Sequence, residues 1–157
     1  MKKSTFLIFG CATLLLTSTL GCDAIKSDLS TYSKTAVPVY NSYSEKFGAK
    51  MDEIAKASTP EELLKTDKET VALLDEFRAK MGEFKPETKE VQDLNQSCIT
   101  NLTNLEDGVK QMGNAIETQD KSLVQTAQAK IDDAVKADEK FRNDLKALED
   151  KHHVQVQ

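Results

Sequence analysis

The sequence has few of the residues that build catalytic centres. It contains no Trp, three Cys and two His, and the two His stand side by side near the C-terminus as His152 and His153. A nucleophilic triad needs a base beside its nucleophile, and no His occurs in the long central part of the chain. The sequence also lacks G-x-S-x-G, Walker-type, G-x-G-x-x-G and H-E-x-x-H motifs. We therefore expect no catalytic residues and no enzymatic activity.

Glycine and proline are also scarce, and acidic residues outnumber basic ones. Six Gly and three Pro among 157 residues, with a hydrophobic fraction of 39%, exclude a collagen-like or disordered chain. The formal net charge of -5 argues against general electrostatic binding to nucleic acid. Three Cys are too few for a dense disulfide scaffold. The length suits one domain of ordinary size, and we expect no nucleic-acid partner.

The N-terminal apolar run is too short to cross a bilayer. It extends from Phe6 to Leu16, whereas a spanning helix needs roughly 20 apolar residues. Lys2 and Lys3 precede it. A positive N-terminus followed by a short apolar run is typical of a secretory signal peptide.

Residues 18–22 (STLGC) resemble the lipobox of bacterial lipoprotein precursors. Gly21 matches the small residue of that motif and Cys22 its invariant cysteine, whereas Thr19 stands where Leu is usual. The resemblance implies that Cys22 receives a diacylglycerol and that the signal is cut between Gly21 and Cys22. Acyl chains such as palmitate would then hold the protein on the extracytoplasmic side of a bacterial membrane. Asp23 matches an inner-membrane retention signal of enteric bacteria, and both inner and outer membranes stay open.

These features divide the chain into four parts. We expect a lipoprotein signal peptide at residues 1–21, a short lipidated N-terminus at 22–24, a helical bundle domain at 25–149 and a flexible tail at 150–157. Apolar periodicity begins as early as Ile25. Little tether therefore separates the predicted anchor from the domain.

Apolar residues recur every three or four positions through most of the domain, which is typical of amphipathic helices. The stripes run from Ile25 to Ile54, from Leu63 to Met81, from Val91 to Ile116 and from Val124 to Leu148. Pro38 interrupts the first stripe without changing its phase, which predicts a kink. The pattern predicts an all-α, antiparallel up-down four-helix bundle with long helices, the first kinked near Pro38. A coiled-coil hairpin that dimerises is the alternative.

Polar residues between the stripes predict where the helices begin. Thr59 and Glu62 form a T-x-x-E capping box before the second stripe. Pro86 is expected to open the third helix, and Thr118 or Asp120 the fourth. The connections between the four helices are therefore short.

An aromatic run marks the first helix. It consists of Tyr32, Tyr40, Tyr43 and Phe47. One interpretation places these residues in the core, with the tyrosine hydroxyls at its rim. The other makes them a groove for a partner helix or an acyl chain, because aromatic residues are favoured at interfaces.

Four further residues on or beside the stripes admit two interpretations each. Cys98 is either a buried thiol or a cysteine exposed for redox chemistry or an intermolecular disulfide. Asp138 is either at the edge of the core near a Lys or Arg, or a polar specificity or ligand contact. Gly108 and Gly113 indicate either close helix approach or a soft site that opens for a ligand.

Four-helix bundles often hold metals or haem, and each of these groups needs characteristic ligands. The E-x-x-H pairs of di-iron bundles and the C-x-x-C-H motif of covalent haem are both absent. Non-covalent haem would need Met51, Met81 or Met112 together with one of the two terminal His. Since a Met on an apolar stripe usually fills a core, we expect no cofactor and no metal ligands.

The leading hypothesis is a non-catalytic, lipid-anchored helical bundle of the bacterial cell envelope. It would contact membrane lipid through acylated Cys22 and act as an interaction or adaptor module for another envelope protein. A carrier of haem, metal or lipid inside the bundle is the alternative.

Overall fold

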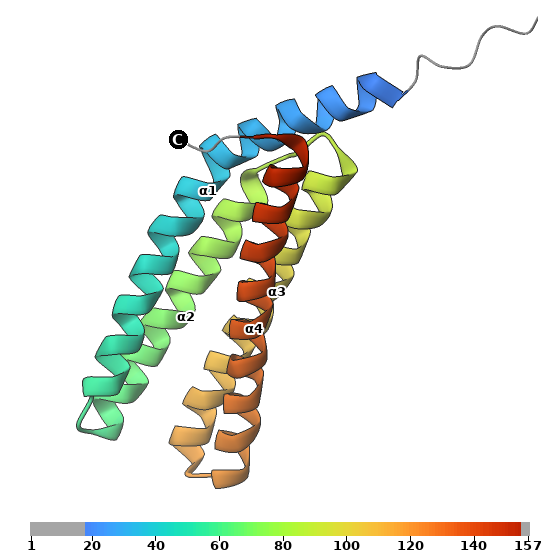
Figure 1. Ribbon diagram of the computed structural model, residues 1–157. Coiled ribbons are helices and arrows are strands. Elements are labelled where there is room, and N and C mark those ends of the chain that lie inside the picture. Colours follow the sequence, from blue (N-terminus) through green and yellow to red (C-terminus); the bar gives the residue numbers. More distant parts are fainter. Residues whose placement is uncertain (1–17, 155–157) are drawn as a thin grey trace, which may run out of the picture.

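The computed structural model describes residues 18–154, and within them it contains four helices and no strand. The helices are α1 (Ser18–Lys56), α2 (Pro60–Glu83), α3 (Lys89–Thr118) and α4 (Lys121–His152). They alternate in direction and pack as an antiparallel bundle, in which α3 contacts both α2 and α4 along its length (Figure 1). The all-α four-helix fold predicted from the apolar stripes is confirmed. Most of the predicted signal peptide, residues 1–17, lies outside the described part.

Helix α1 is bent rather than broken. It is continuous over its 39 residues with Pro38 inside it. Figure 1 shows its N-terminal part crossing the end of the bundle at which α4 finishes, while the rest runs beside α2. A proline inside a helix removes one backbone donor and crowds the preceding turn. The continuous apolar stripe and the bend agree with the predicted kink.

Two helix starts follow the capping residues of the sequence. Thr59 Oγ1 accepts a hydrogen bond from the backbone N–H of Glu62 at 3.2 Å, and the Glu62 carboxylate accepts one from the N–H of Thr59 at 3.3 Å. This is the predicted capping box of α2. Asp120 caps α4 by accepting from the N–H groups of Ser122 and Leu123. Asp120, rather than Thr118, therefore starts the fourth helix.

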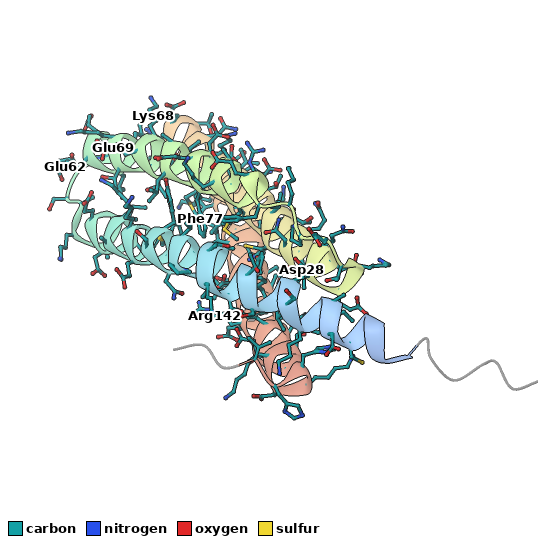
Figure 2. All side chains as sticks on the ribbon, turned by 90° about the horizontal axis from the view of Figure 1, so that it is seen from above. Asp28, Glu62, Lys68, Glu69, Phe77 and Arg142 are labelled. Atoms are coloured by element: carbon teal, nitrogen blue, oxygen red, sulfur yellow. The ribbon has the colours of Figure 1, made fainter. Side chains whose placement is uncertain are left out.

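Helix α3 starts at Lys89 and is capped from another helix. Thr88, its N-cap residue, makes no side-chain bond to its own helix. Instead, Oδ2 of Asp28 in α1 accepts hydrogen bonds from the N–H of Glu87 at 3.0 Å and from the N–H and hydroxyl of Thr88 at 2.7 and 2.6 Å. Figure 2 shows Asp28 where α1 passes the α2–α3 turn. The expectation that Pro86 opens this helix is wrong by three residues, and the residues just before Lys89 belong to the turn that is bonded to Asp28.

Helix α4 runs further than expected, so the tail predicted at 150–157 begins too early. The helix continues to His152, which is 9% exposed. His153 closes it with a left-handed conformation (φ 53°), and the N–H of Val154 donates to the carbonyl of Glu149 at 2.9 Å. Val154 packs against the core. Residues 155–157 lie outside the described part.

The buried core lies mainly in one half of the bundle. We call the end that carries the α1–α2 and α3–α4 turns the distal end. Most of the buried core residues lie in the other half, and Leu105, Val109 and Ala134 carry the core past the middle of the bundle. The whole core consists of Leu29, Tyr32, Ala36, Tyr40, Tyr43, Leu74, Phe77, Met81, Val91, Leu94, Cys98, Leu102, Leu105, Val109, Ala134, Phe141 and Leu145. Ala115 and Ala127 are the small residues buried nearer the distal end.

The larger apolar residues nearest the two distal turns are only partly covered. Met51, Ile54, Leu63, Leu64, Met112, Ile116 and Leu123 are half-buried, and Val124 is 37% exposed. Helices α1 and α4 make few contacts with each other in the described part of the chain. The predicted stripes are therefore correct as helix faces, but only part of each stripe lies in a closed core.

Candidate functional site

The candidate lipidation site lies at the start of α1. Gly21 and Cys22 belong to the first turns of this helix, and Cys22 is exposed. None of the described helices is both long and apolar enough to cross a membrane. Cleavage after Gly21 and acylation of Cys22 stay predictions, and the exposed thiol is accessible for that chemistry.

The aromatic run is in the core and does not form an open groove. Tyr32, Tyr40 and Tyr43 are 3%, 4% and 7% exposed, and Phe47 is half-buried against the core. Their rings are covered by the protein's own helices, because this face of α1 packs against the rest of the bundle. As placed, the three tyrosines offer no surface to a partner, and the core interpretation describes them.

Each tyrosine hydroxyl donates to a different helix. Tyr32 donates to Oδ1 of Asn95 in α3 at 3.1 Å, and the Asn95 amide donates to the backbone carbonyl of Met81 in α2 at 3.2 Å. Burial, with a smaller contribution from Cys98, raises the pKa of Tyr32 far above its ordinary value. This buried network joins three helices through one asparagine.

The Tyr40 hydroxyl reaches α4. It donates to Oδ1 of Asp138 at 2.5 Å, and Oδ2 of Asp138 accepts from Nε of Arg142 at 2.9 Å. The Tyr40 ring lies 5.7 Å from the ring centre of Phe77 and 5.0 Å from that of Phe141; Figure 2 shows Phe77 and Arg142. Burial and the bond to Asp138 raise the pKa of Tyr40. Asp138 is thus at the edge of the core beside an arginine, as the first interpretation of this residue has it.

The Tyr43 hydroxyl binds α2. It donates to Oε1 of Glu76 at 2.6 Å, and its ring stacks on Phe77 with 5.1 Å between ring centres and 13° between planes. The bond to Glu76, followed by burial, raises the pKa of Tyr43 to about 12. The Lys46 ammonium lies 4.4 Å from the centre of the same ring. Through its three tyrosines α1 is therefore bonded to α2, α3 and α4.

Cys98 is buried at 3% exposure, and burial raises the pKa of its thiol to about 12. A thiol with so high a pKa is a poor nucleophile at neutral pH. Cys98 is thus a small apolar core residue in this fold.

Sequence reasoning missed the most unusual acid of the bundle, Asp67 in α2. It is 8% exposed and faces Gly113 of α3. A Cβ added to Gly113 would overlap with Oδ2 of Asp67 and lie 3.0 Å from its Cγ. Burial, followed by the charge of Glu117, raises the pKa of Asp67 to about 6, whereas Lys68 acts in the opposite direction. The sequence did indicate that Asp67 faces inward, because it stands midway between Leu63 and Val71, four residues from each, on the apolar stripe.

Both glycines of α3 mark close contacts. A Cβ on Gly108 would lie 3.0 Å from Cγ1 of Ile131 and 3.3 Å from its backbone nitrogen. Gly108 therefore permits close approach of α3 and α4, as the plain interpretation of this residue has it. The neighbour of Gly113 is instead a carboxylate, which the sequence pattern did not indicate.

The conceivable haem ligands are dispersed along the bundle. Met51 and Met112 are half-buried in the distal half, whereas His152 ends α4 at the opposite end. Met81 is fully buried in the core cluster. Among residues 18–154, no group of three or more His, Cys, Asp or Glu side chains is placed to hold a metal ion. Nε2 of His152 is buried and has no hydrogen-bond partner.

Comparison of the chain with known proteins gives no match: no family model, no curated protein and no solved structure is significantly similar to it.

Proposed function

We propose that this protein is a lipid-anchored, extracytoplasmic helical bundle of the bacterial cell envelope that binds another envelope protein without catalysing a reaction. The observation that carries the proposal is the lipobox-type cysteine, Cys22, exposed at the start of α1. Two or three acyl chains on one cysteine suffice for stable anchoring.

The path of α1 supports a fixed position of the bundle at the membrane. Seven residues after Cys22, Leu29 is already fully buried in the core, and Asp28 holds the α2–α3 turn. No flexible linker separates Cys22 from the core. Acylation would thus hold the end where α1 begins next to the bilayer, and the distal end would project away from it. At about 1.5 Å per residue, the 30 residues of α3 extend about 45 Å.

The distal end supports the interaction role. Its larger apolar side chains, such as Met51 on α1 and Val124 on α4, are incompletely covered, although they continue the stripes that form the core elsewhere. Binding sites on protein surfaces often expose apolar side chains in this way. The surface that would bind a partner is accordingly the distal end, not the aromatic run.

Anchoring is tested by expressing the full chain in a bacterial host with labelled palmitate and analysing it by mass spectrometry. We expect the label on Cys22, an N-terminus at the same residue, and membrane fractionation. In Cys22→Ala, label and membrane attachment should both be lost. Unlabelled, soluble wild-type protein would contradict the proposal.

Partner binding is tested with a photocrosslinking amino acid placed at Val124. Val135, which lies on the same helix and is 49% exposed, is the matched control position. We expect one envelope protein to crosslink from Val124 and not from Val135, and only when Cys22 is intact. Equal crosslinking from both positions would exclude the distal end as the specific binding surface. Crosslinks solely between copies of this chain would favour a carrier or a structural oligomer over an adaptor.

A further inference from the structure

The side of Asp67 that faces solvent opens into a hollow between α2 and α3. The hollow has a volume of about 270 Å³. Leu64 and Val71, one turn before and one turn after Asp67, form apolar walls, and Gly113 and Asn114 of α3 complete it. Because Gly113 has no Cβ, the Asp67 carboxylate can lie against α3 at this point.

The Asp67 carboxylate lacks a donor. More than nine-tenths of this residue is buried, and no described residue donates a hydrogen bond to it or lies within ion-pair distance. An ionised carboxylate that loses most of its hydration and gains no protein partner costs free energy, and the water that it keeps is on the side of the hollow. The carboxylate thus has unused acceptor capacity directed into the hollow.

The two lysines that line the hollow are paired with other acids. Nζ of Lys68 lies 3.5 Å from Oε1 of Glu117. Lys110 bonds to Glu106, which also accepts from Nε of Arg78 at 3.2 Å. Each of these groups is balanced within its own network. One negative charge, that of Asp67, is left without a counter-charge.

We propose that this hollow binds a small organic cation with a primary ammonium group, whose N–H donates to the Asp67 carboxylate. A single unpaired carboxylate matches one positive charge, and an N–H donor supplies the hydrogen bond that Asp67 lacks. Leu64 and Val71 would cover a short alkyl part. The volume lies just below the roughly 300–1,000 Å³ of common ligand pockets, which favours a small ligand.

Protons compete with the cation. The groups facing Asp67 are Lys68 from its own helix and Lys110 and Glu117 from α3. With a pKa of about 6, Asp67 is mostly ionised at neutral pH and mostly protonated below about pH 5. Binding of the cation should therefore weaken as the pH falls, and the bound cation should in turn lower the pKa of Asp67.

The test is calorimetric titration of the full chain, in nonionic detergent at about neutral pH, with ethylammonium chloride as the probe. Sodium chloride at equal ionic strength is the reference titrant. We expect saturable binding of ethylammonium that becomes at least about tenfold weaker in Asp67→Asn, because a hydrogen bond to a charged group is lost. Asp107→Asn, at an exposed acid on α3, is the matched control and should bind as the wild type does.

A second readout is independent of calorimetry. Carbon NMR of the Asp67 carboxyl group should show a lower pKa when ethylammonium is present and no change with sodium. Three results would overturn the proposal: equal responses to sodium and ethylammonium, unchanged binding in Asp67→Asn, or titration of Asp67 by protons that ethylammonium leaves unaffected. The proposal does not depend on acylation of Cys22, so it stands or falls separately from the proposed anchoring.

Discussion

At the scale of single residues, the tyrosines of α1 combine two functions. Their rings fill the core, and their hydroxyls supply directional bonds to three different helices. A buried tyrosine usually satisfies its hydroxyl in this way. The free energy that each hydroxyl contributes depends on its partner: Asn95 is 5% exposed, whereas Glu76 is exposed to water.

We expect Tyr32→Phe to destabilise the protein by about 1–3 kcal/mol and Tyr43→Phe by less than about 1 kcal/mol. Removing the Tyr32 hydroxyl leaves buried Oδ1 of Asn95 without its donor, whereas Glu76 can bond to water instead. Urea unfolding of both variants measures the difference. Equal losses would show that the partner's burial does not matter here.

Asp67→Asn should increase the free energy of unfolding at about pH 7, by an amount on the order of 2 kcal/mol. The folded protein raises the pKa of Asp67 from 3.8 to about 6. Below the lower value the acid is protonated in both states and causes no penalty. As the pH rises through this interval the unfolded chain loses its proton first, so wild-type stability falls, and above about 6 the loss is complete.

The measurement is chemical unfolding of wild type and Asp67→Asn across that interval. The advantage of the variant should shrink toward zero as the pH falls to about 4. Asp107→Asn, in which an exposed acid is replaced, should differ from the wild type by no more than about 0.5 kcal/mol. An advantage of Asp67→Asn that is independent of pH would contradict this account.

At the scale of elements, two kinds of helix start occur. Helices α2 and α4 are capped by residues that directly precede them, Thr59 and Asp120. Helix α3 depends on Asp28, which lies about sixty positions earlier in the sequence. A local cap forms whenever its helix forms, but the Asp28 cap exists only when α1 is packed against the α2–α3 turn.

Asp28→Ala is expected to destabilise the protein by about 1–3 kcal/mol, because three hydrogen bonds to one carboxylate oxygen are lost. Amide exchange at Thr88 should accelerate as well, since its N–H loses its acceptor. Asp23→Ala, at an exposed acid of the same helix, is the control and should change neither quantity. Normal protection of the Thr88 amide in Asp28→Ala would show that the α2–α3 turn keeps its structure without Asp28.

At the scale of the whole molecule, stability is unevenly distributed. The large apolar side chains that are less than about 2% exposed all lie in the half where α1 begins and α4 ends; they are Leu29, Leu74, Met81, Val91 and Phe141. Near the distal turns the large apolar side chains are mostly half-buried. Regions with few buried apolar contacts open at lower free energy than the core. The half next to the predicted anchor is thus the rigid one, and the half that we propose for partner binding is the more adaptable.

Hydrogen exchange followed by mass spectrometry should show this difference within α1 itself. We expect amides of residues 48–56 to exchange at least about tenfold faster than those of residues 32–43, although both segments belong to one continuous helix. Comparing two segments of one helix removes differences in secondary structure. Uniform protection along α1 would contradict the division into a rigid and an adaptable half.

Much of this architecture was determined by the sequence alone. Apolar spacing set the number and faces of the helices, Thr59 and Asp120 set two of their starts, and Pro38 indicated the bend, because all these signals act within a few residues along the chain. The tertiary structure decided which helices the tyrosine hydroxyls reach and that Asp28 caps α3. It also decided that Asp67 meets Gly113 and in which part of the bundle the stripes close into a core. Those features depend on how helices far apart in sequence cross one another, and periodicity along a single helix carries no information about that crossing.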